Sequence, residues 1–365
     1  MRSSRPVLAA VLTSVALVAV PAPATRAATP SKPCTDGSRS CVIATANTYL
    51  DALLSNDGSH VRLAPKARRT ENGQNTGDDA KAIRTALSSP TPNEVNTRIR
   101  DKRWFISGRN ATVFYLLDTS TLPPSPLHTT TVHIVERFRV SRGLIHEIEA
   151  IFWIEPGTSE GGSGWPAPPD ESYTALPAVS PAPEPDETGW CSRSSVRCAI
   201  RSARSYLAAL PTRDYRKTQL HPHVRRTQNG DTTAVDADGV RRNGQDPHPD
   251  AAISGVRDLR WFVTRKGRAF KVISFSLADT STVPQTAAHT GTVHLANRFK
   301  VVDGLIVEIE SIYWVSPGPT PEGSGWEREL DGSRRTTLAM CSVMPVGSGG
   351  SDRGYRSGKT GARLR

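Results

Sequence analysis

The sequence has few of the residues by which catalytic and cofactor sites are commonly recognised. It holds five cysteines and three methionines among 365 residues, and aromatic residues make up 6% of the chain. It contains no phosphate-binding glycine loop, no nucleophile elbow and no Cys–His pair. After residue 20, no segment is apolar enough to cross a bilayer. These absences predict a protein without a cofactor, a metal site or a membrane span.

The N-terminus has the pattern of a secretory signal peptide, residues 1–27. Arg2 and Arg5 precede an apolar run over 6–20, and small residues follow, with cleavage expected after Ala24 or Ala27. We therefore expect the mature protein to be secreted and extracellular.

The positive charge of the chain is concentrated at its end. The formal net charge is +11, and the C-terminal stretch 331–365 alone holds seven Lys/Arg and two Asp. A nucleic-acid interface would instead concentrate charge with aromatic residues on a folded face, so no nucleic-acid partner is expected. The basic tail, 327–365, has a disordered composition. It is either simply solvated or attached to an anionic polymer of the cell envelope.

The cysteines form two pairs with one spacing. Cys34 and Cys41 are separated by six residues, and so are Cys191 and Cys198. In an exported chain this spacing predicts two small disulfide loops. Cys341, in the tail, is left without a predicted partner.

One unit of about 130 residues, the size of a single domain, is present twice. At an offset of 157 residues, Cys34 to Phe105 align with Cys191 to Phe262, and the offset becomes 161 beyond an insertion near Lys266. The repeat predicts domains at 34–165 and 190–326. The linker between them, 166–189, contains seven prolines and is expected to be extended. The two domains are expected to pack as a pseudo-dimer or to be joined only by this linker.

Each unit has helical periodicity first and strand patterns later, which predicts an α+β fold. The first copy is expected to have a leading helix at 41–54 and a second at 78–88, whose weaker counterpart in the second copy is expected at 249–256. The expected strands of the first copy are 98–107, 111–118, 129–140 and 144–155.

The last strand of each copy carries two glutamates, in GLIHEIEAIFW at 143–153 and GLIVEIESIYW at 304–314. A two-residue turn at Arg142-Gly143 would place Glu136 opposite Glu149 and Phe138 opposite Glu147 on one apolar face. The corresponding residues of the second copy would be Asn297 opposite Glu310, with Glu308 and Phe299 beside them.

Two interpretations of these carboxylates compete. In the first, they line a cavity, where burial raises the pKa and allows acid–base chemistry. In the second, they are structural and pair with Arg68, Arg69 or Arg103. The catalytic candidates are therefore Glu147, Glu149, Glu308 and Glu310.

The motifs YLDALLSND, RRTENGQ and VERFRVSRGLIHEIEAI together resemble the nuclear-transport-factor-2-like superfamily, which includes SnoaL-like cyclases and ketosteroid isomerase. The C-x6-C, YLxAL, TENG and EIE combination is similar to an uncharacterised secreted domain of that type. The resemblance implies a curved antiparallel sheet wrapped around helices, forming a cone with an apolar pocket. It also implies that such domains often pair through their sheets, and that the carboxylates inside the cone would be those just named.

The residues expected to line such a pocket come in matched pairs. They are Glu136 with Asn297, Trp153 with Trp314, Phe138 with Phe299, and Asn72 with Asn229. The tryptophans also suit a core, and each Asn-Gly pair also suits a plain turn. The leading expectation for function is binding of a small, partly apolar ligand in the cone. The alternatives are an acid–base enzyme of dehydratase, isomerase or hydrolase type, and a non-catalytic protein of the cell envelope.

Overall fold

The computed structural model describes residues 35–89, 94–121, 129–155, 162–165, 195–245, 252–281 and 289–317, with Ser324 and Trp326. The expected signal peptide, linker and tail lie outside these residues, as do Cys34, Cys191 and Cys341. Export and both disulfides therefore stay predictions. Among the described helices, none is long and apolar enough to cross a membrane.

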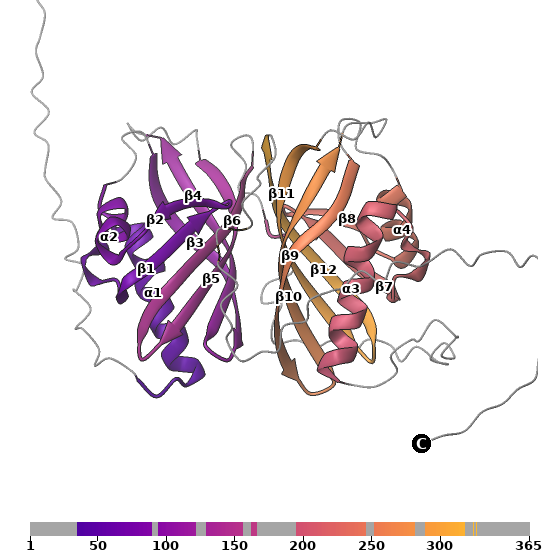
Figure 1. Ribbon diagram of the computed structural model, residues 1–365, viewed down its shortest axis with the longest axis horizontal. Helices are drawn as coiled ribbons and strands as arrows, with labels where there is room; N and C mark the ends of the chain where they lie inside the picture. Colours follow the sequence, from indigo (N-terminus) through magenta and orange to yellow (C-terminus); the bar gives the residue numbers. More distant parts are fainter. Residues whose placement is uncertain are drawn as a thin grey trace, which may run out of the picture. The chain divides into compact units, whose positions relative to one another are not determined.

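In the first domain a helix comes first, then a short hairpin, a second helix and four long strands (Figure 1). The elements are α1 (Arg39–Ser55), β1 (Leu63–Glu71), β2 (Gln74–Gly77), α2 (Ala80–Leu87), β3 (Glu94–Ser107), β4 (Asn110–Thr121), β5 (Thr129–Ser141) and β6 (Leu144–Ile154), with a 3-10 turn at Gly58–His60. The side chain of Ser38 caps α1 by accepting the N–H of Cys41.

The second domain repeats this order. Its elements are α3 (Val196–Thr212), β7 (Leu220–Gln228), β8 (Asp231–Ala234), α4 (Ala237–Gln245), β9 (Ala252–Lys266), β10 (Ala269–Ser281), β11 (His289–Val302) and β12 (Leu305–Pro317), with a 3-10 turn at Tyr215–Lys217.

Each domain contains a six-stranded sheet of the same topology, with strand orders β2-β1-β6-β5-β4-β3 and β8-β7-β12-β11-β10-β9. Neighbours are antiparallel except β1 beside β6 and β7 beside β12, which are parallel. The predicted α+β fold and internal repeat are confirmed. The short hairpins β1–β2 and β7–β8 were not predicted, because the burial along β1 does not alternate regularly between the faces.

The second domain differs from the first at its second helix and at its β9–β10 hairpin. The counterpart of α2 is α4 at Ala237–Gln245, and the proposed 249–256 is wrong because β9 begins at Ala252. Gly239 and Gly244 weaken the helical pattern of α4. The inserted residues lengthen the β9–β10 hairpin, as expected for an insertion at a turn.

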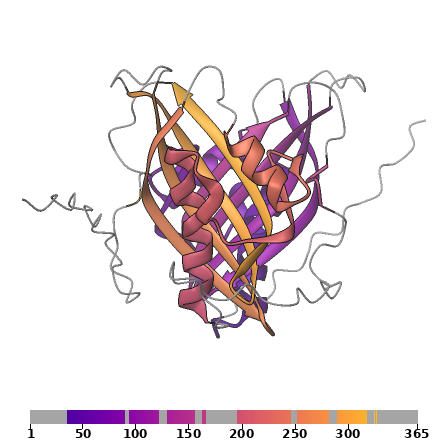
Figure 2. The same ribbon diagram turned by 90° about the vertical axis from the view of Figure 1, so that its right-hand side faces the viewer.

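The helices cover one face of each sheet, here called the inner face. Figure 1 shows α1 and α2 against the first sheet, and Figure 2 shows α3 and α4 lying across the second. In the first domain the inner core joins Ala46, Leu50 and Ile83 of the helices to Phe138 and Ile148 of the sheet, all almost fully buried. The second domain has its own core of the same kind.

The β5–β6 hairpin begins as predicted and then departs from the predicted register. The turn at Arg142-Gly143 has φ of 53° and 69°, and Val140 pairs with Ile145. A β-bulge then leaves His146 as an extra residue, so that Arg139 pairs with Glu147. From that point every residue of β6 lies on the face opposite to the one predicted.

The outer faces of the two sheets pack against each other, and both sheets belong to one compact unit. A buried cluster joins Phe114 and Ile151 of the first domain to Phe275 and Ile312 of the second. The chain is therefore a pseudo-dimer of its own two domains, as the resemblance implied.

Candidate functional site

The four glutamates named as catalytic candidates lie on the outer faces, outside both cones. Glu147 pairs across the sheet with Arg139, and Glu149 with Arg137. In the second domain Glu308 pairs with Lys300 and Glu310 with Arg298. The predicted pairing of Glu136 with Glu149 is therefore wrong, because the bulge places these two carboxylates on opposite faces.

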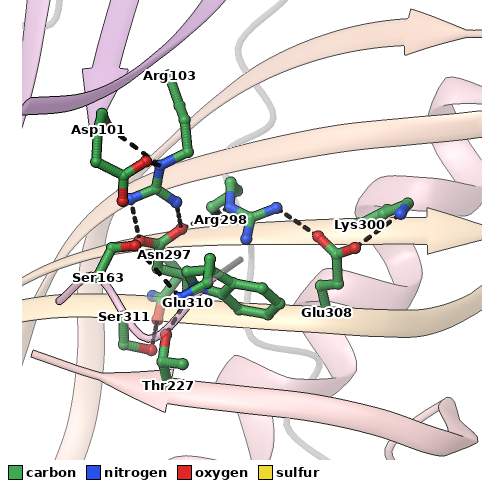
Figure 3. A network of polar contacts seen from close by, with 11 residues as sticks. Asp101, Arg103, Ser163, Thr227, Asn297, Arg298, Lys300, Glu308, Glu310 and Ser311 are labelled. Carbon is green, nitrogen blue, oxygen red and sulfur yellow. Dashed lines mark hydrogen bonds and ion pairs between the residues drawn. The ribbon is translucent and has the colours of Figure 1, made fainter. Parts of the chain in front are cut away.

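Two of these glutamates join the domains through reciprocal ion pairs. Arg103 of β3 donates to Glu310 at 2.5 and 2.8 Å. Arg260 of β9 donates to Glu149 at 2.7 Å from each terminal nitrogen. Figure 3 shows Glu310 between Arg103 and Arg298, and Glu308 between Arg298 and Lys300. The structural interpretation of the glutamates, including the role suggested for Arg103, is the one that the contacts support.

A strand irregularity directs these arginines toward the partner domain. Asp101 and Asp258 have φ of 54° and 51°, and each lies where the β3–β4 or β9–β10 register shifts by a bulge. Asp tolerates this left-handed conformation better than most residues. Each bulge re-aims the next residues, so that Arg103 and Arg260 reach the outer face.

The ion pairs keep three of the outer carboxylates ionised, those of Glu147, Glu308 and Glu310. Burial opposes ionisation of Glu310, but the guanidinium groups of Arg103 and Arg298 outweigh it and hold its pKa below the usual value. The pKa of Glu147 is lowered in the same way by Arg137 and Arg139 against burial, and that of Glu308 by Arg298 and Lys300. Carboxylates held in this state are poor general acids near neutral pH.

Asn72 and Asn229 close turns at the sheet. The side-chain amide of Asn72 donates to the carbonyl oxygen of Phe152 at 3.2 Å and accepts the N–H of Phe152 at 2.9 Å. Asn229 makes the same pair of bonds with Tyr313. Each asparagine thus replaces a strand residue beside β6 or β12, and the turn interpretation of the Asn-Gly pairs is confirmed.

The glycines of the same turns contact the other domain. A Cβ on Gly73 would overlap the imidazole ring of His294, and one on Gly230 would overlap that of His133. Trp153 lies beside His133 on the outer face, with ring centroids 5.7 Å apart. Trp153 and its repeat equivalent Trp314, which pairs with His294, therefore do not line the cones.

Among the described residues, the carboxyl group buried inside the first cone is that of Glu136. Its side chain lies on the inner face with 2% of the residue exposed, and the hydroxyl of Tyr115 donates to it at 3.0 Å. Burial, with a smaller contribution from the charge of Glu71, raises the pKa of Glu136 to about 8, against the opposing effects of Tyr115 and Arg69. At pH 7 this carboxyl therefore carries its proton.

A second pair of polar side chains lies in the same cone. Arg69 donates to the hydroxyl of Tyr49 at 3.2 Å, and both residues are buried. Burial and the nearby Glu136 raise the pKa of both Tyr49 and Tyr115, so both phenols stay neutral. Phe138 packs edge-on against Tyr49, with ring centroids 5.5 Å apart.

The second cone has an amide in place of this acid. Asn297 replaces Glu136, and it donates to Ser274 at 3.3 Å and accepts the hydroxyl of Ser311 at 2.6 Å. Ser276 stands at the repeat position of Tyr115. Phe299 packs against Tyr206, as Phe138 does against Tyr49. The inner faces of the two cones are therefore matched in shape and different in chemistry.

Two segments of the chain, residues 35–152 and 192–313, match one family, described as "Domain of unknown function (DUF8021)". Together they span more than half of the sequence. The chain belongs to the DUF8021 family. It carries the DUF8021 domain twice, and the two matches coincide with the two sheets described above. No curated protein matches the chain.

Solved structures similar to parts of the chain each correspond to about one DUF8021 domain. An LEH-like epoxide hydrolase from M. tuberculosis is 16% identical, with 31% of this chain and 84% of that protein covered and a TM-score of 0.27. An NTF2-like protein of unknown function from Cytophaga hutchinsonii is 10% identical, with 32% and 90% covered and a TM-score of 0.24. An NTF2-like protein from Burkholderia xenovorans is 12% identical, with 34% and 99% covered and a TM-score of 0.27.

Sequence reasoning identified Glu136 and missed its neighbours. The signal was present in the comparison of the two DUF8021 domains, because Tyr115 and Glu136 are both replaced in the second copy whereas Tyr49 and Arg69 are kept as Tyr206 and Arg226. Joint replacement of two residues suggests that they are in contact. Among the described residues, no group of His, Cys, Asp and Glu is arranged to hold a metal ion.

Proposed function

We propose that the first DUF8021 domain binds a small, partly apolar molecule inside its cone, and that Glu136 holds a polar group of that molecule. The observation that carries the proposal is a buried carboxyl group enclosed by apolar side chains and held by the hydroxyl of Tyr115. Burying such a group is costly unless its hydrogen bonds are satisfied. The second domain forms the same sheet with neutral Asn297 at this position. The acid is thus not required for folding.

The geometry around Glu136 indicates which ligand group would fit. Tyr115 donates to one carboxyl oxygen, Oε2. The carboxyl proton is then available for donation to an acceptor, such as the carbonyl or hydroxyl oxygen of a ligand. The inner-face neighbours Val113, Ile134 and Phe138 are apolar and buried, and would contact the hydrocarbon part of the molecule.

An acid–base enzyme is the second candidate, and it rests on the same carboxyl. A group with a pKa of about 8 can donate and accept a proton near neutral pH. The reaction would be a dehydration, an isomerisation or a hydrolysis, with Glu136 as the proton carrier. Glu147, Glu308 and Glu310 take no part in it, because arginine and lysine partners hold their pKa values low, and Glu149 is bound by Arg137 and Arg260 at the domain interface.

The test is a thermal-shift screen of the full chain against polyketide-like, terpenoid and saccharide pools. A ligand of the first cone should stabilise the wild type and lose affinity in Glu136→Leu. The matched change in the second cone, Asn297→Leu, should leave affinity unchanged, provided that circular dichroism shows both variants folded. A hit that binds Glu136→Leu as tightly as the wild type would contradict the proposal.

Glu136→Gln separates binding from catalysis. Glutamine keeps the size and one donor, so affinity should stay nearly intact, but it cannot transfer a proton. Loss of turnover with retained affinity would establish the enzyme. Binding of an acceptor ligand should also weaken above pH 8, because ionisation removes the carboxyl donor.

We also propose that the chain is exported and that its tail, 327–365, contacts an anionic polymer of the envelope. The support is the pattern of residues 1–27 and the charge of the tail. Mass spectrometry of the secreted protein should show that its first residue is the one after Ala24 or the one after Ala27. Deletion of 331–365 should release the protein from isolated envelope polymer, and retention of the truncated form would exclude this role for the tail.

A further inference from the structure

A hollow lies at the end of the first domain where two hairpin turns meet the start of α1. Its volume is about 540 Å³. The lining residues are Thr35, Asp36, Gly37, Cys41, Val42, Gly108, Arg109, Val140, Ser141, Arg142, Gly143 and His146. Glu136 is not among them, so this hollow is separate from the proposed cone site.

The polar wall of the hollow is mainly basic. Arg109 comes from the β3–β4 turn, Arg142 from the β5–β6 turn, and His146 is the bulged residue of β6. One carboxylate, that of Asp36, stands among them and accepts the N–H of Ser38 at 2.9 Å. Two guanidinium groups against one carboxylate leave the wall with a positive charge. Val42 and Val140 give the hollow an apolar floor.

In the second domain the two corresponding turns are joined by an ion pair. Arg268 lies in the β9–β10 turn and Asp303 in the β11–β12 turn, and they form an ion pair, with Arg268 donating to Asp303 at 3.1 Å. The residue at the repeat position of His146 is Val307. In the second domain Asp303 neutralises the charge of Arg268. In the first domain Arg109 and Arg142 both line the hollow.

The backbone at Arg142 adds an independent reason to look for a ligand. Arg142 has φ of 53°, and Asp303 has φ of 50°. Aspartate is favoured in this left-handed conformation and arginine is not. Local turn preference therefore accounts for the aspartate of the second domain and leaves the arginine of the first unexplained. Residues that break a local rule concentrate at functional sites.

We propose that this hollow binds a small organic anion, with its phosphate or carboxylate group held by Arg109 and Arg142. Guanidinium groups donate paired hydrogen bonds to such oxyanions. The ring nitrogens of His146 offer a further donor, and Val42 and Val140 contact the organic part. Because both arginines are exposed, binding weakens as salt rises.

The experiment is a titration of the full chain at low salt with inorganic phosphate, phenyl phosphate and benzoate, followed by NMR of the backbone amides. The amides of Gly108, Arg142 and Gly143 should shift and saturate, and phenyl phosphate or benzoate should bind more tightly than inorganic phosphate. Comparison of phenyl phosphate with benzoate identifies the preferred oxyanion.

Arg142→Asp is the decisive variant, because aspartate suits the local backbone and is the residue of the second domain. It should weaken binding at least about tenfold, the loss expected for a charged hydrogen bond. Asp303→Asn, in the equivalent turn of the second domain, should leave binding unchanged. Equal urea midpoints for Arg142→Asp and the wild type show that the fold is kept, and Arg109→Gln replaces it as the test if they differ.

Three results would overturn the proposal. The first is an unchanged dissociation constant in Arg142→Asp or, where that fold is disturbed, in Arg109→Gln. The second is saturable shifts that lie outside the residues lining the hollow. The third is the absence of saturable binding by all three probes at low salt.

Discussion

Arg103 holds both carboxylate oxygens of Glu310, and Arg260 holds both of Glu149. The first pair runs from the first domain to the second, and the other pair runs back. The internal repeat maps Arg103 onto Arg260 and Glu149 onto Glu310. The interface is thus self-complementary, as in a two-fold symmetric dimer, although one chain supplies both halves.

Removing Arg103 should destabilise the protein strongly. Glu310 is 3% exposed and would keep only Arg298 as a charged hydrogen-bond donor. Breaking a buried ion pair from one side typically costs about 3–5 kcal/mol, and the remaining arginine places Arg103→Ala near the lower end. Urea unfolding measures the change. Arg216→Ala removes an exposed ion pair with Asp214 and should leave the midpoint nearly unchanged. Equal effects of the two variants would contradict a buried interdomain pair.

Glu136 should make the stability of the protein depend on pH. The pKa of its carboxyl is raised from 4.5 to about 8 in the folded state. Between these values the unfolded chain has released the proton and the folded chain retains it. The free energy of unfolding therefore falls as pH rises, by up to about 1.4 kcal/mol per pH unit. The loss begins above pH 4.5 and levels off above pH 8.

Glu136→Gln should remove this dependence. Urea unfolding of both proteins at pH 5, 6, 7 and 8 gives the difference in free energy at each pH. As pH rises, the free energy of unfolding of the variant should increase relative to that of the wild type. Parallel curves over this range would show that Glu136 is ionised in the folded protein.

Gly73→Ala tests the contact between the Asn-Gly turn and the other domain. Gly73 has φ of 77°, and an alanine would also meet the ring of His294. Gly267 has φ of 61° with nothing near its Cβ position, so Gly267→Ala imposes only the backbone strain, about 1–2 kcal/mol. Gly73→Ala should cost clearly more in thermal or urea unfolding.

Removing the imidazole ring of His294 should reduce the additional destabilisation caused by Gly73→Ala. Adding His294→Ala to Gly73→Ala should recover part of the lost stability, although His294→Ala alone destabilises. An additive double variant would indicate that His294 is not what excludes a side chain at residue 73.

The cysteine spacing predicts disulfides between Cys34 and Cys41 and between Cys191 and Cys198. Cys41 and Cys198 occupy the same buried place in the first turns of α1 and α3. Peptide mass mapping without reduction should find both links in secreted protein. Cys34→Ser with Cys41→Ser should then lower stability by roughly 2–3 kcal/mol, and reduced thiols in the exported form would refute the assignment.

Much of the architecture was readable from local patterns. The helical spacing of α1, the strands β3 to β6 and the repeat offset were all predicted from residue type and period. The Asn-Gly and Arg142-Gly143 turns were also identified, because their backbone requirements are local. The α4 helix was misplaced, since two glycines weaken a pattern that only the repeat offset reveals.

The location of the candidate site could not be read in the same way. Glu136 was named as a pocket residue and lies in the cone, whereas Glu147 and Glu149 were expected beside it and lie on the opposite face. The error arises from one residue, His146, which the bulge leaves without a partner. Side-chain direction in a strand alternates with a period of two, so one extra residue reverses every assignment after it.

By itself, the sequence determined the duplication, the leading helices, the long strands of the first domain and the kinds of residue available for chemistry, because these depend on neighbours along the chain. Only the tertiary structure decided which carboxylate enters the cone and which join the domains. That choice depends on a bulge and on arginines from strands more than a hundred residues away, including Arg260 beside Glu149. Burial without an ion pair keeps Glu136 protonated, and burial between two paired arginines keeps Glu310 ionised.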